Sequence, residues 1–350
     1  MQRSPIIFSV DVEDWGQSVL DQSLPISGYC ADNVLRMLDL LSHDADARGT
    51  FFVLGKFARK HPRVVRDIAA AGHEVASHGF GHVPLHRLDP ERFRSDVRRS
   101  SAVLADILGQ QVQGYRAPQF SIVRSTLWAL RVLAEEGLAF DSSIFPFAGR
   151  RYGIDDWPVE TRQVRLGGGL SIVEFPLTTF ALAGRRLPIS GGGYARLLPG
   201  TLLAHLFKRE VARRSSWPVF YCHPHELDPD EFRRHAPVPT WGTKPIGWRM
   251  RWHQGLGRRG FAAKLATMLK HFHFRSFAQA RRGQPSAAET WLVDHRPPGL
   301  PRLPRTPAMP NGSPTPARGP SLMGRAAEVT GGGSPWQDDS SGQVSARESV

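Results

Sequence analysis

Three acidic residues stand close together near the start of the chain, in the stretch "FSVDVEDW" at positions 8–15. Asp11, Glu13 and Asp14 follow directly after the apolar residues 6–8. Carboxylates this close raise one another's pKa unless a cation or a basic side chain offsets the repulsion. The stretch therefore predicts that a cation or a basic side chain lies among these carboxylates. The simpler alternative is a solvated turn or the start of a helix.

Two histidines with metal-ligand spacing occur in "VASHGFGH". His78 and His82 lie four residues apart, which lets two imidazoles converge on one metal ion from a helical turn or a compact loop. The chain has 14 histidines, so this pair by itself is also explained by ordinary surface or core residues. Its meaning depends on which other groups the fold brings near it.

Three further residues could take part in the same chemistry. Arg116 stands in "GYRAPQFS", Asp141 in "FDSSIFP" and His223 in "FYCHPHE". A buried arginine can hold a carboxylate by a bidentate contact, although it can equally form a structural salt bridge. Each of these three residues is ambiguous when taken alone, so their meaning depends on whether the fold brings them together with the acids and the two histidines.

The elements that must position these residues alternate between strand and helix. Strands are predicted at 5–11, 49–54, 73–77, 112–116, 137–141, 171–175 and 217–222, and amphipathic helices at 32–46, 57–71, 89–108 and 125–136. Such alternation predicts an α/β fold with a parallel sheet, and seven or eight units most often close into a barrel. In a barrel, chemistry collects at the C-terminal ends of the strands. All of the residues named above fall at or just after such ends.

Taken in order and spacing, these blocks resemble the polysaccharide deacetylase family, the NodB-homology carbohydrate esterases (carbohydrate esterase family 4). The resemblance covers about residues 5–280 and includes "GTFFVLGKFARKHPRVVRDIAAAGHEVASHG" at 49–79. It looks closest to the subfamily found at exopolysaccharide and exosortase loci, which shares "DVEDW", "FDSSIFP" and a stretch like "SGGGYARLLP". The resemblance implies a deformed (β/α)7 barrel in residues 1–282 that hydrolyses the acetamide of an N-acetylated sugar and releases acetate.

The resemblance also implies roles for individual residues. Asp11 would be the general base, oriented by Arg116, and His223 the general acid, with Asp141 as a supporting catalytic residue. His78 and His82, with one carboxylate, would hold one divalent metal ion. Zinc is the first choice for this ion, and cobalt, nickel and iron suit the same ligands.

The carboxylate ligand of that metal is either Glu13 or Asp14. Most members of the family have two adjacent aspartates in this motif, whereas the present chain has Asp-Val-Glu-Asp-Trp. Strand alternation puts Asp11 and Glu13 on one face and Asp14 on the other, which favours Glu13. A bulge at residues 12–13 would favour Asp14 instead.

Charge and composition limit the partners of the protein. The formal net charge is +13, which favours an anionic partner such as an acidic polysaccharide or an anionic membrane surface. No recognisable nucleic-acid-binding module accompanies this charge, so specific nucleic-acid binding is not expected. The partner implied by the resemblance is an N-acetylated polysaccharide or oligosaccharide.

Residues 283–350 are rich in Pro, Gly and Ser and lack apolar periodicity, which predicts a disordered tail. The N-terminus shows no signal-peptide pattern, and no apolar run is long enough for a transmembrane helix. We therefore expect a cytoplasmic protein that contacts the inner face of the membrane peripherally, where lipid-linked sugar precursors would be available.

Two other functions remain open at this point. A cyclic-amide hydrolase of the allantoinase type would use the same barrel and the same residues. A non-catalytic carbohydrate-binding or assembly protein could also keep the fold, although such a protein has no need of a perturbed carboxylate beside a metal.

Overall fold

The computed structural model describes residues 3–20, 22, 24–231, 252, 254–283 and 288–291. Seven strands of this part run parallel and pair in the order β10-β1-β2-β3-β4-β5-β7. They are β1 (Ser4–Val12), β2 (Thr50–Val53), β3 (Glu74–Ser77), β4 (Gly114–Tyr115), β5 (Phe140–Asp141), β7 (Leu170–Glu174) and β10 (Val219–Cys222). Each of them falls within or overlaps one of the seven strands expected from the sequence, and the predicted α/β class is confirmed.

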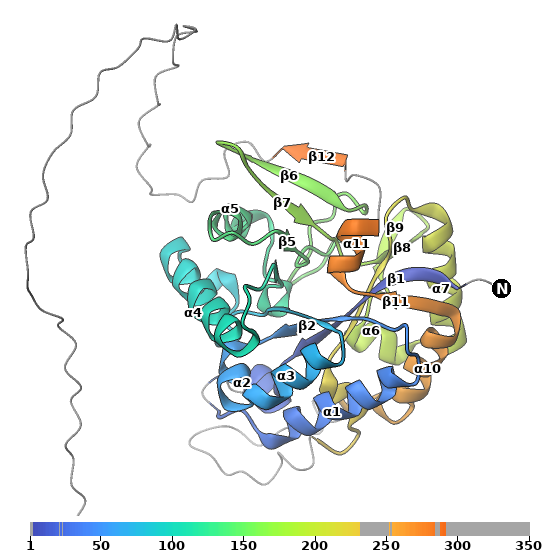
Figure 1. Cartoon of the computed structure of the whole chain (residues 1–350). Coiled ribbons are helices and arrows are strands. Elements are labelled where there is room, and N and C mark those ends of the chain that lie inside the picture. The colour runs from blue at the N-terminus through green and yellow to red at the C-terminus, as the bar shows by residue number, and fades with distance from the viewer. Residues whose placement is uncertain are drawn as a thin grey trace, which may run out of the picture. The chain divides into compact units, whose positions relative to one another are not determined.

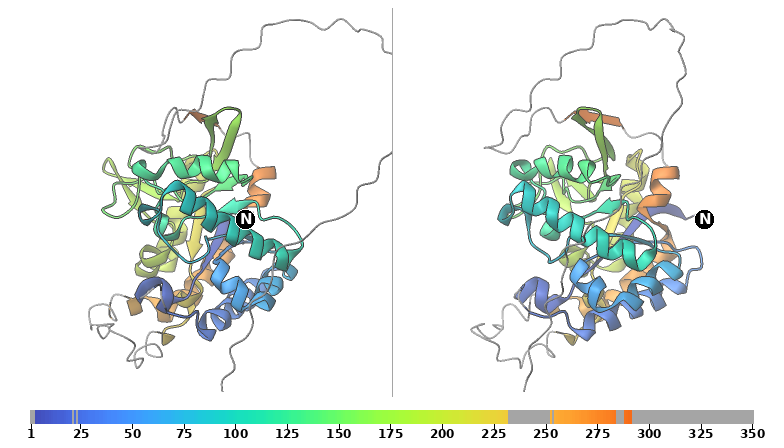
Figure 2. Two further views of the ribbon diagram at one scale, coloured as in Figure 1. Left: turned by 90° about the vertical axis from the view of Figure 1, so that its left-hand side faces the viewer. Right: turned by 60° about the vertical axis from the view of Figure 1, so that its left-hand side comes forward.

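Helices surround this sheet (Figure 1). They are α1 (Gly28–Ser42), α2 (Gly55–Lys60), α3 (Pro62–Ala70), α4 (Pro90–Leu108), α5 (Trp128–Glu135), α6 (Gly192–Leu197), α7 (Gly200–Arg213), α10 (Phe261–His271) and α11 (Phe277–Gly283). In Figure 2, α2 to α5 cover one side of the strands together. The single helix expected at 57–71 is divided into α2 and α3, because Pro62 begins a new helix at its first position.

Additional strands extend the sheet beyond those expected. The strand β6 (Arg162–Gly167) pairs antiparallel with β7, and β11 (Phe272–Arg275) pairs with the first half of β1. The strands β8 (Thr179–Leu182) and β9 (Arg185–Pro188) form a separate hairpin. Within the described residues no ladder joins β7 to β10, where only a bridge from Gly191 to Tyr221 is formed. The barrel is therefore deformed on this side, as the (β/α)7 expectation implies.

Strand β1 shows how the sequence builds the two layers of the core. Its even-numbered residues, Ile6 to Val12, pack in the large cluster that includes the helix side chains Val34, Phe57 and Val65. The odd-numbered Ile7 packs instead in the inner cluster, with Phe52 of β2 among its members. Ser9 and Asp11 continue this inward-facing row. The alternation therefore places apolar side chains against the helices. On the inner side it places the polar residues Ser9 and Asp11 toward the C-terminal end of the strand.

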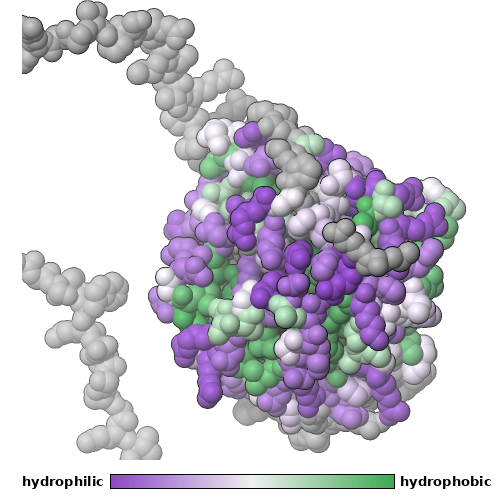
Figure 3. Space-filling model, turned by 45° about the vertical axis from the view of Figure 1, so that its right-hand side comes forward, coloured by the Kyte–Doolittle hydropathy of each residue, from purple (hydrophilic) through white to green (hydrophobic). Residues whose placement is uncertain are grey.

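The surface contrasts with this interior. On the face shown in Figure 3, hydrophilic groups cover most of the described residues and apolar groups are scattered among them. Among the described helices, none combines the length and the apolar character that crossing a membrane requires.

Part of the predicted tail takes a defined structure. Gly283 is the last residue of α11, and Ala288–Trp291 form the strand β12, which pairs in parallel with β6. The expectation of disorder from residue 283 onward was therefore wrong for these residues, because β6 offers a free edge for pairing. Residues 284–287 and 292–350 lie outside the described part.

Candidate active site

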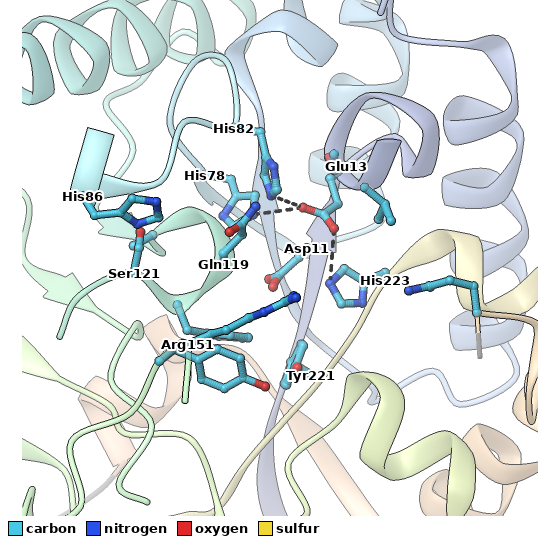
Figure 4. Close-up of a pocket in the computed structure, with 16 residues that line it drawn as sticks. Asp11, Glu13, His78, His82, His86, Gln119, Ser121, Arg151, Tyr221 and His223 are labelled. Atoms are coloured by element: carbon cyan, nitrogen blue, oxygen red, sulfur yellow. Dashed lines mark ion pairs between the residues drawn. The ribbon is translucent and has the colours of Figure 1, made fainter. Parts of the chain in front are cut away.

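Asp11 and Glu13 lie at the C-terminal end of β1, at the floor of a cavity of about 1200 Å³. The neighbouring strands β10 and β2 pair with β1 on its two sides, so both acids are held at the centre of the sheet. Both side chains are buried. Figure 4 shows Glu13 directed toward three histidines, with Asp11 beside it. The residues lining the cavity include Asp11, Glu13, His78, His82, Gln119, Arg151, Tyr152, Tyr221, His223 and Gln254.

The two histidines come from the loop that follows β3. Gly79 in this loop has a φ of +77°, and a Cβ there would lie 2.8 Å from a carboxylate oxygen of Asp96. That same oxygen accepts a hydrogen bond of 2.9 Å from the backbone N–H of Phe80. Asp96 on α4 thus fixes the turn, and the turn brings His78 and His82 over the end of β1.

Glu13, His78 and His82 form a compact cluster. His82 Nε2 lies 2.5 Å and His78 Nε2 3.5 Å from Glu13 Oε2, and the three ligand atoms lie within 4.8 Å of one another. Burial by itself raises the pKa of the Glu13 carboxyl, but His82 and His223, with hydrogen bonds from His78 and His82, lower it well below its ordinary value. Glu13 therefore carries a negative charge in the buried site.

The donor set fits a divalent metal ion. His78 Nδ1 lies 2.9 Å from the carbonyl oxygen of Arg116, which can only accept, so Nδ1 carries the proton and Nε2 faces Glu13. This hydrogen bond fixes the imidazole so that Nε2 of His78 is directed toward Glu13, the orientation that a metal ligand requires. Two imidazole nitrogens and one carboxylate are the ligands typical of zinc and related ions.

Asp14 is not part of this cluster. One of its oxygens accepts an N–H from Gln17 at 3.1 Å, and the other accepts the backbone N–H of Ser27 at 2.9 Å and the Ser27 hydroxyl. These contacts tie the turn after β1 to the start of α1. The structure therefore brings Glu13 and not Asp14 to the histidines, as strand alternation predicts.

Arg116 holds Asp11 from below. Its Nη1 lies 2.7 Å from Asp11 Oδ1 and 2.9 Å from Ser9 Oγ. Its Nε and Nη2 donate to the carbonyl and hydroxyl oxygens of Ser142, at 2.8 Å and 2.9 Å, and the guanidinium lies over the ring of Phe52. All three guanidinium nitrogens donate hydrogen bonds, so Arg116 is fixed in place and holds the carboxylate of Asp11 in one orientation.

Asp141 does not line the cavity. Its two oxygens accept from the backbone N–H and the hydroxyl of Ser143, at 2.9 Å and 2.7 Å, and that hydroxyl accepts from the N–H of Ala117 at 2.7 Å. Burial, and then the neighbouring Asp141, raises the pKa of Glu174 well above its ordinary value. Asp141 therefore supports the segment that follows Arg116, and the catalytic position given to it from the sequence is corrected to an indirect one.

His223 follows β10 and approaches the cluster from its other side in Figure 4. Its Nε2 lies 3.4 Å from Glu13 Oε1, and its Nδ1 lies 3.6 Å from Glu226 Oε2. Burial by itself lowers the pKa of His223, but the carboxylates of Glu13 and Glu226 outweigh this and raise it to about 9. The imidazole is thus held in a form that can donate a proton at neutral pH.

Sequence reasoning missed Glu226 and Arg196. Glu226 Oε2 accepts the backbone N–H of His223 at 3.0 Å, and Glu226 Oε1 lies 3.0 Å from Arg196 Nε. The acid in "HPHE" lies three residues after His223, a spacing that signals a local cap. Nothing in the sequence indicates that Arg196 of α6 would be its partner.

Family models match the chain in two separate segments. Residues 27–136, which include both metal-spaced histidines and Arg116, match the family model described as "Polysaccharide deacetylase". Residues 142–282, which include His223, match a "Domain of unknown function (DUF3473)". Asp11 and Glu13 precede both matched segments.

Two curated relatives and one solved structure illustrate the similarity. The chain is 30% identical over 95 residues to a peptidoglycan-N-acetylglucosamine deacetylase of Bacillus cereus, covering 27% of this chain and 34% of the relative. It is 30% identical over 131 residues to a chitooligosaccharide deacetylase of a Bradyrhizobium species, covering 36% of this chain and 56% of the relative. The chain thus spans about a third to a half of the length of these relatives.

A crystal structure of a putative polysaccharide deacetylase from Mycobacterium smegmatis shares the fold. Its TM-score is 0.53 at 19% identity, over 86% of this chain and 96% of that one. The matched segment, the named relatives and the residues gathered at the end of β1 agree with the resemblance to the polysaccharide deacetylase family that the sequence shows.

Proposed function

We propose that the protein is a metal-dependent hydrolase that removes N-acetyl groups from amino sugars in a polysaccharide or in its lipid-linked precursor. The observation that carries this proposal is one cavity that holds the Glu13, His78 and His82 cluster together with Asp11 and His223. The relatives named for deacetylation of peptidoglycan and chitooligosaccharide support the reaction type.

The residues divide the reaction between them. A metal ion held by Glu13, His78 and His82 would polarise the acetamide carbonyl and acidify water. Asp11, fixed by Arg116, accepts the proton of the attacking water as the bond from its oxygen to the carbonyl carbon forms. His223 gives its proton to the nitrogen as the C–N bond breaks, so that acetate and a free amine leave.

The substrate class rests on the likeness of "DVEDW", "FDSSIFP" and "SGGGYARLLP" to the subfamily of exopolysaccharide and exosortase loci. An exopolysaccharide under assembly, or its lipid-linked precursor, is therefore the first substrate to test. The net charge of +13 favours approach to an anionic membrane surface that would carry such a precursor.

The test is acetate release from a panel of N-acetylated oligosaccharides, with a cyclic amide as the comparison substrate. We expect acetate from the sugars, loss of activity on chelation and recovery when zinc or cobalt is added back. Full activity in metal-stripped protein would overturn the mechanism. Hydrolysis of the cyclic amide without any acetate release would overturn the substrate class.

A further inference from the structure

The outward side of α7 carries basic residues and no exposed acid. Its exposed positions follow the helical repeat and form one stripe, made of Thr201, Leu202, His205, Lys208, Arg209, Ala212 and Arg213. The single acid of this helix, Glu210, is buried and pairs with Arg214. The charged side chains of the stripe are therefore all positive.

The same charge imbalance extends to the elements beside α7. Helix α10 packs next to it (Figure 1), and neither α10 nor the segment 252–260 contains an acid. The exposed charged side chains of these two segments are Arg259 and Lys270. Between residues 192 and 283, Asp230 is the one exposed acid that the structure describes. The exposed charge of this part of the surface is thus almost entirely positive.

Exposed apolar side chains gather at one end of the stripe. Leu197 ends α6, and Trp252 and Leu256 lie on one helical turn, in which the N–H of Leu256 donates to the carbonyl of Trp252 at 3.0 Å. These three side chains line one cavity of about 590 Å³ and are 59%, 64% and 37% exposed. Leu202, in the first turn of α7, is also exposed. We call Leu197, Trp252 and Leu256 the apolar end.

Contacts between the elements hold the stripe and the apolar end together. Lys264 Nζ on α10 donates to the carbonyl oxygens of Ala195 and Arg196 on α6. A Cβ on Gly200, the first residue of α7, would lie 3.4 Å from the Cα of Lys264. A Cβ on Gly257 would lie 2.3 Å from the carbonyl oxygen of Arg196. The helices α6, α7 and α10 and the segment 252–257 therefore meet in one packed region.

An anionic membrane surface matches both properties of this region. Lysine and arginine side chains are attracted to anionic headgroups, and tryptophan and leucine side chains enter the boundary between headgroups and acyl chains. A soluble polyanion would match the charges but would leave the apolar end in water. Two copies that met through the same stripe would bring like charges together, which is unfavourable.

The chain itself offers no matching partner for the stripe. Residues 232–251 and 292–350 lie outside the described part. The first of these segments contains five basic residues and no acid, and the second carries acidic and basic residues in nearly equal number. Neither segment has the excess of negative charge that the stripe would attract.

We propose that the stripe of α7 and the apolar end dock on an anionic membrane surface. The proposal deepens the proposed function, because it locates the membrane contact through which a lipid-linked precursor would be reached. The cavity lined by the apolar end is also lined by Glu13 and His223. Docking therefore brings the opening of the candidate active site to the bilayer surface.

Cosedimentation of the full chain with vesicles tests this proposal. We expect binding to mixed phosphatidylglycerol and phosphatidylcholine vesicles, weaker binding at high salt, and little binding to phosphatidylcholine alone. Lys208→Gln/Arg213→Gln should weaken binding to the anionic vesicles at least about tenfold. Arg63→Gln/Arg66→Gln is the matched control, since it removes the same charge from exposed positions of α3 and should leave binding nearly unchanged.

The apolar end is tested with a second pair of variants. Trp252→Ala/Leu256→Ala should weaken binding to the anionic vesicles about tenfold. Leu182→Ala/Leu187→Ala removes side chains of similar exposure, 56% and 42%, from the hairpin of β8 and β9, and it should have little effect. All four side chains are exposed, so both variants should fold.

Several outcomes would overturn the proposal. One is the absence of binding to anionic vesicles at low salt, and another is equal loss in the α7 and α3 variants, because net charge alone would then explain binding. Competition by DNA or a polyuronate, with no effect of Trp252→Ala/Leu256→Ala, would assign the stripe to a soluble polyanion instead. A dimer that forms without vesicles and dissociates in Trp252→Ala/Leu256→Ala would assign the apolar end to a second copy.

A separate measurement distinguishes this proposal from the proposed function. Acetate release from a soluble N-acetylated oligosaccharide should be unchanged in Lys208→Gln/Arg213→Gln, because neither residue lines the candidate active site. Vesicle binding without acetate release would refute the proposed function and leave the docking surface. Acetate release without vesicle binding would do the reverse.

Discussion

Arg116 Nη1 lies 2.7 Å from Asp11 Oδ1, and both side chains are buried. The burial of this ion pair determines how the stability of the protein responds when either charge is removed. Removing one partner leaves an uncompensated buried charge, which costs far more than the net contribution of the pair.

We therefore predict that Arg116→Met lowers the free energy of unfolding by about 3–5 kcal/mol. Urea unfolding measures this loss, and Asp11→Asn/Arg116→Met should recover part of it because no charge remains. Arg124→Met is the control, since Arg124 pairs with Asp155 and Asp156 in solvent and should leave stability almost unchanged. An Arg116→Met protein as stable as wild type would show that Arg116 and Asp11 do not form a buried ion pair.

The choice of carboxylate ligand can be tested by metal content. Glu13→Gln should lose the bound ion, because the carboxylate next to His78 and His82 is removed. Asp14→Ala should keep the ion and lose about 1–2 kcal/mol of stability, because the N–H groups of Gln17 and Ser27 lose their acceptor. Elemental analysis of purified protein decides the matter, and loss of metal from Asp14→Ala alone would reverse our ligand choice.

Proton donation by His223 can be separated from metal binding. His223→Ala should reduce turnover by roughly 10²- to 10⁴-fold while the metal content stays near that of wild type. Glu226→Gln should reduce turnover on the order of tenfold, because it keeps an acceptor for the backbone N–H of His223 and loses the charge beside Nδ1. Glu210→Gln is the control, since Glu210 is also a buried acid but is paired with Arg214 and does not line the cavity. Equal turnover in Glu226→Gln and Glu210→Gln would refute the role of Glu226.

The buried His73 predicts a loss of stability in acid. Burial, with a contribution from Arg48, lowers its pKa to about 4, and its Nδ1 accepts the N–H of Gly49. In the unfolded chain His73 binds a proton below pH 6.5, whereas the folded protein resists this proton down to pH about 4. The stabilisation is therefore complete above pH 6.5 and is lost as the pH falls toward 4, by about 3 kcal/mol.

His73→Gln keeps an acceptor for Gly49 and removes the titration. Urea unfolding of both proteins between pH 4 and pH 7 should show a weaker pH dependence in the variant over this window. Parallel curves for the two proteins would show that His73 does not titrate as we describe.

The seven parallel strands and the ends that carry the site could be predicted from the sequence because both depend on local patterns. Alternation along residues 5–11 indicates which side chains face inward, and it also indicates that Glu13 accompanies Asp11. The spacing of His78 and His82 is likewise a local signal, since one loop carries both residues.

The remaining features depend on contacts between distant segments. Asp141 reads as a site residue because it ends a strand, but Ser143 and Glu174 determine where its carboxylate is held. The pairing of Glu226 with Arg196 requires knowledge of how α6 packs beside β10. The strand β12 forms by pairing with the edge of β6. The composition of residues 288–291 alone does not predict this partner.

The position of β1 between β2 and β10 has a consequence for synthesis on the ribosome. The strand β1 carries Asp11 and leads into Glu13, and it pairs through Val10 with Cys222, which is made much later. The nascent chain can pair β1 with β2 and β2 with β3 early. The other edge of β1 stays exposed until β10 has been synthesised. Folding of this long-range pair should thus be the slow step, and a chain stalled before β10 is an aggregation-prone intermediate for chaperones to hold.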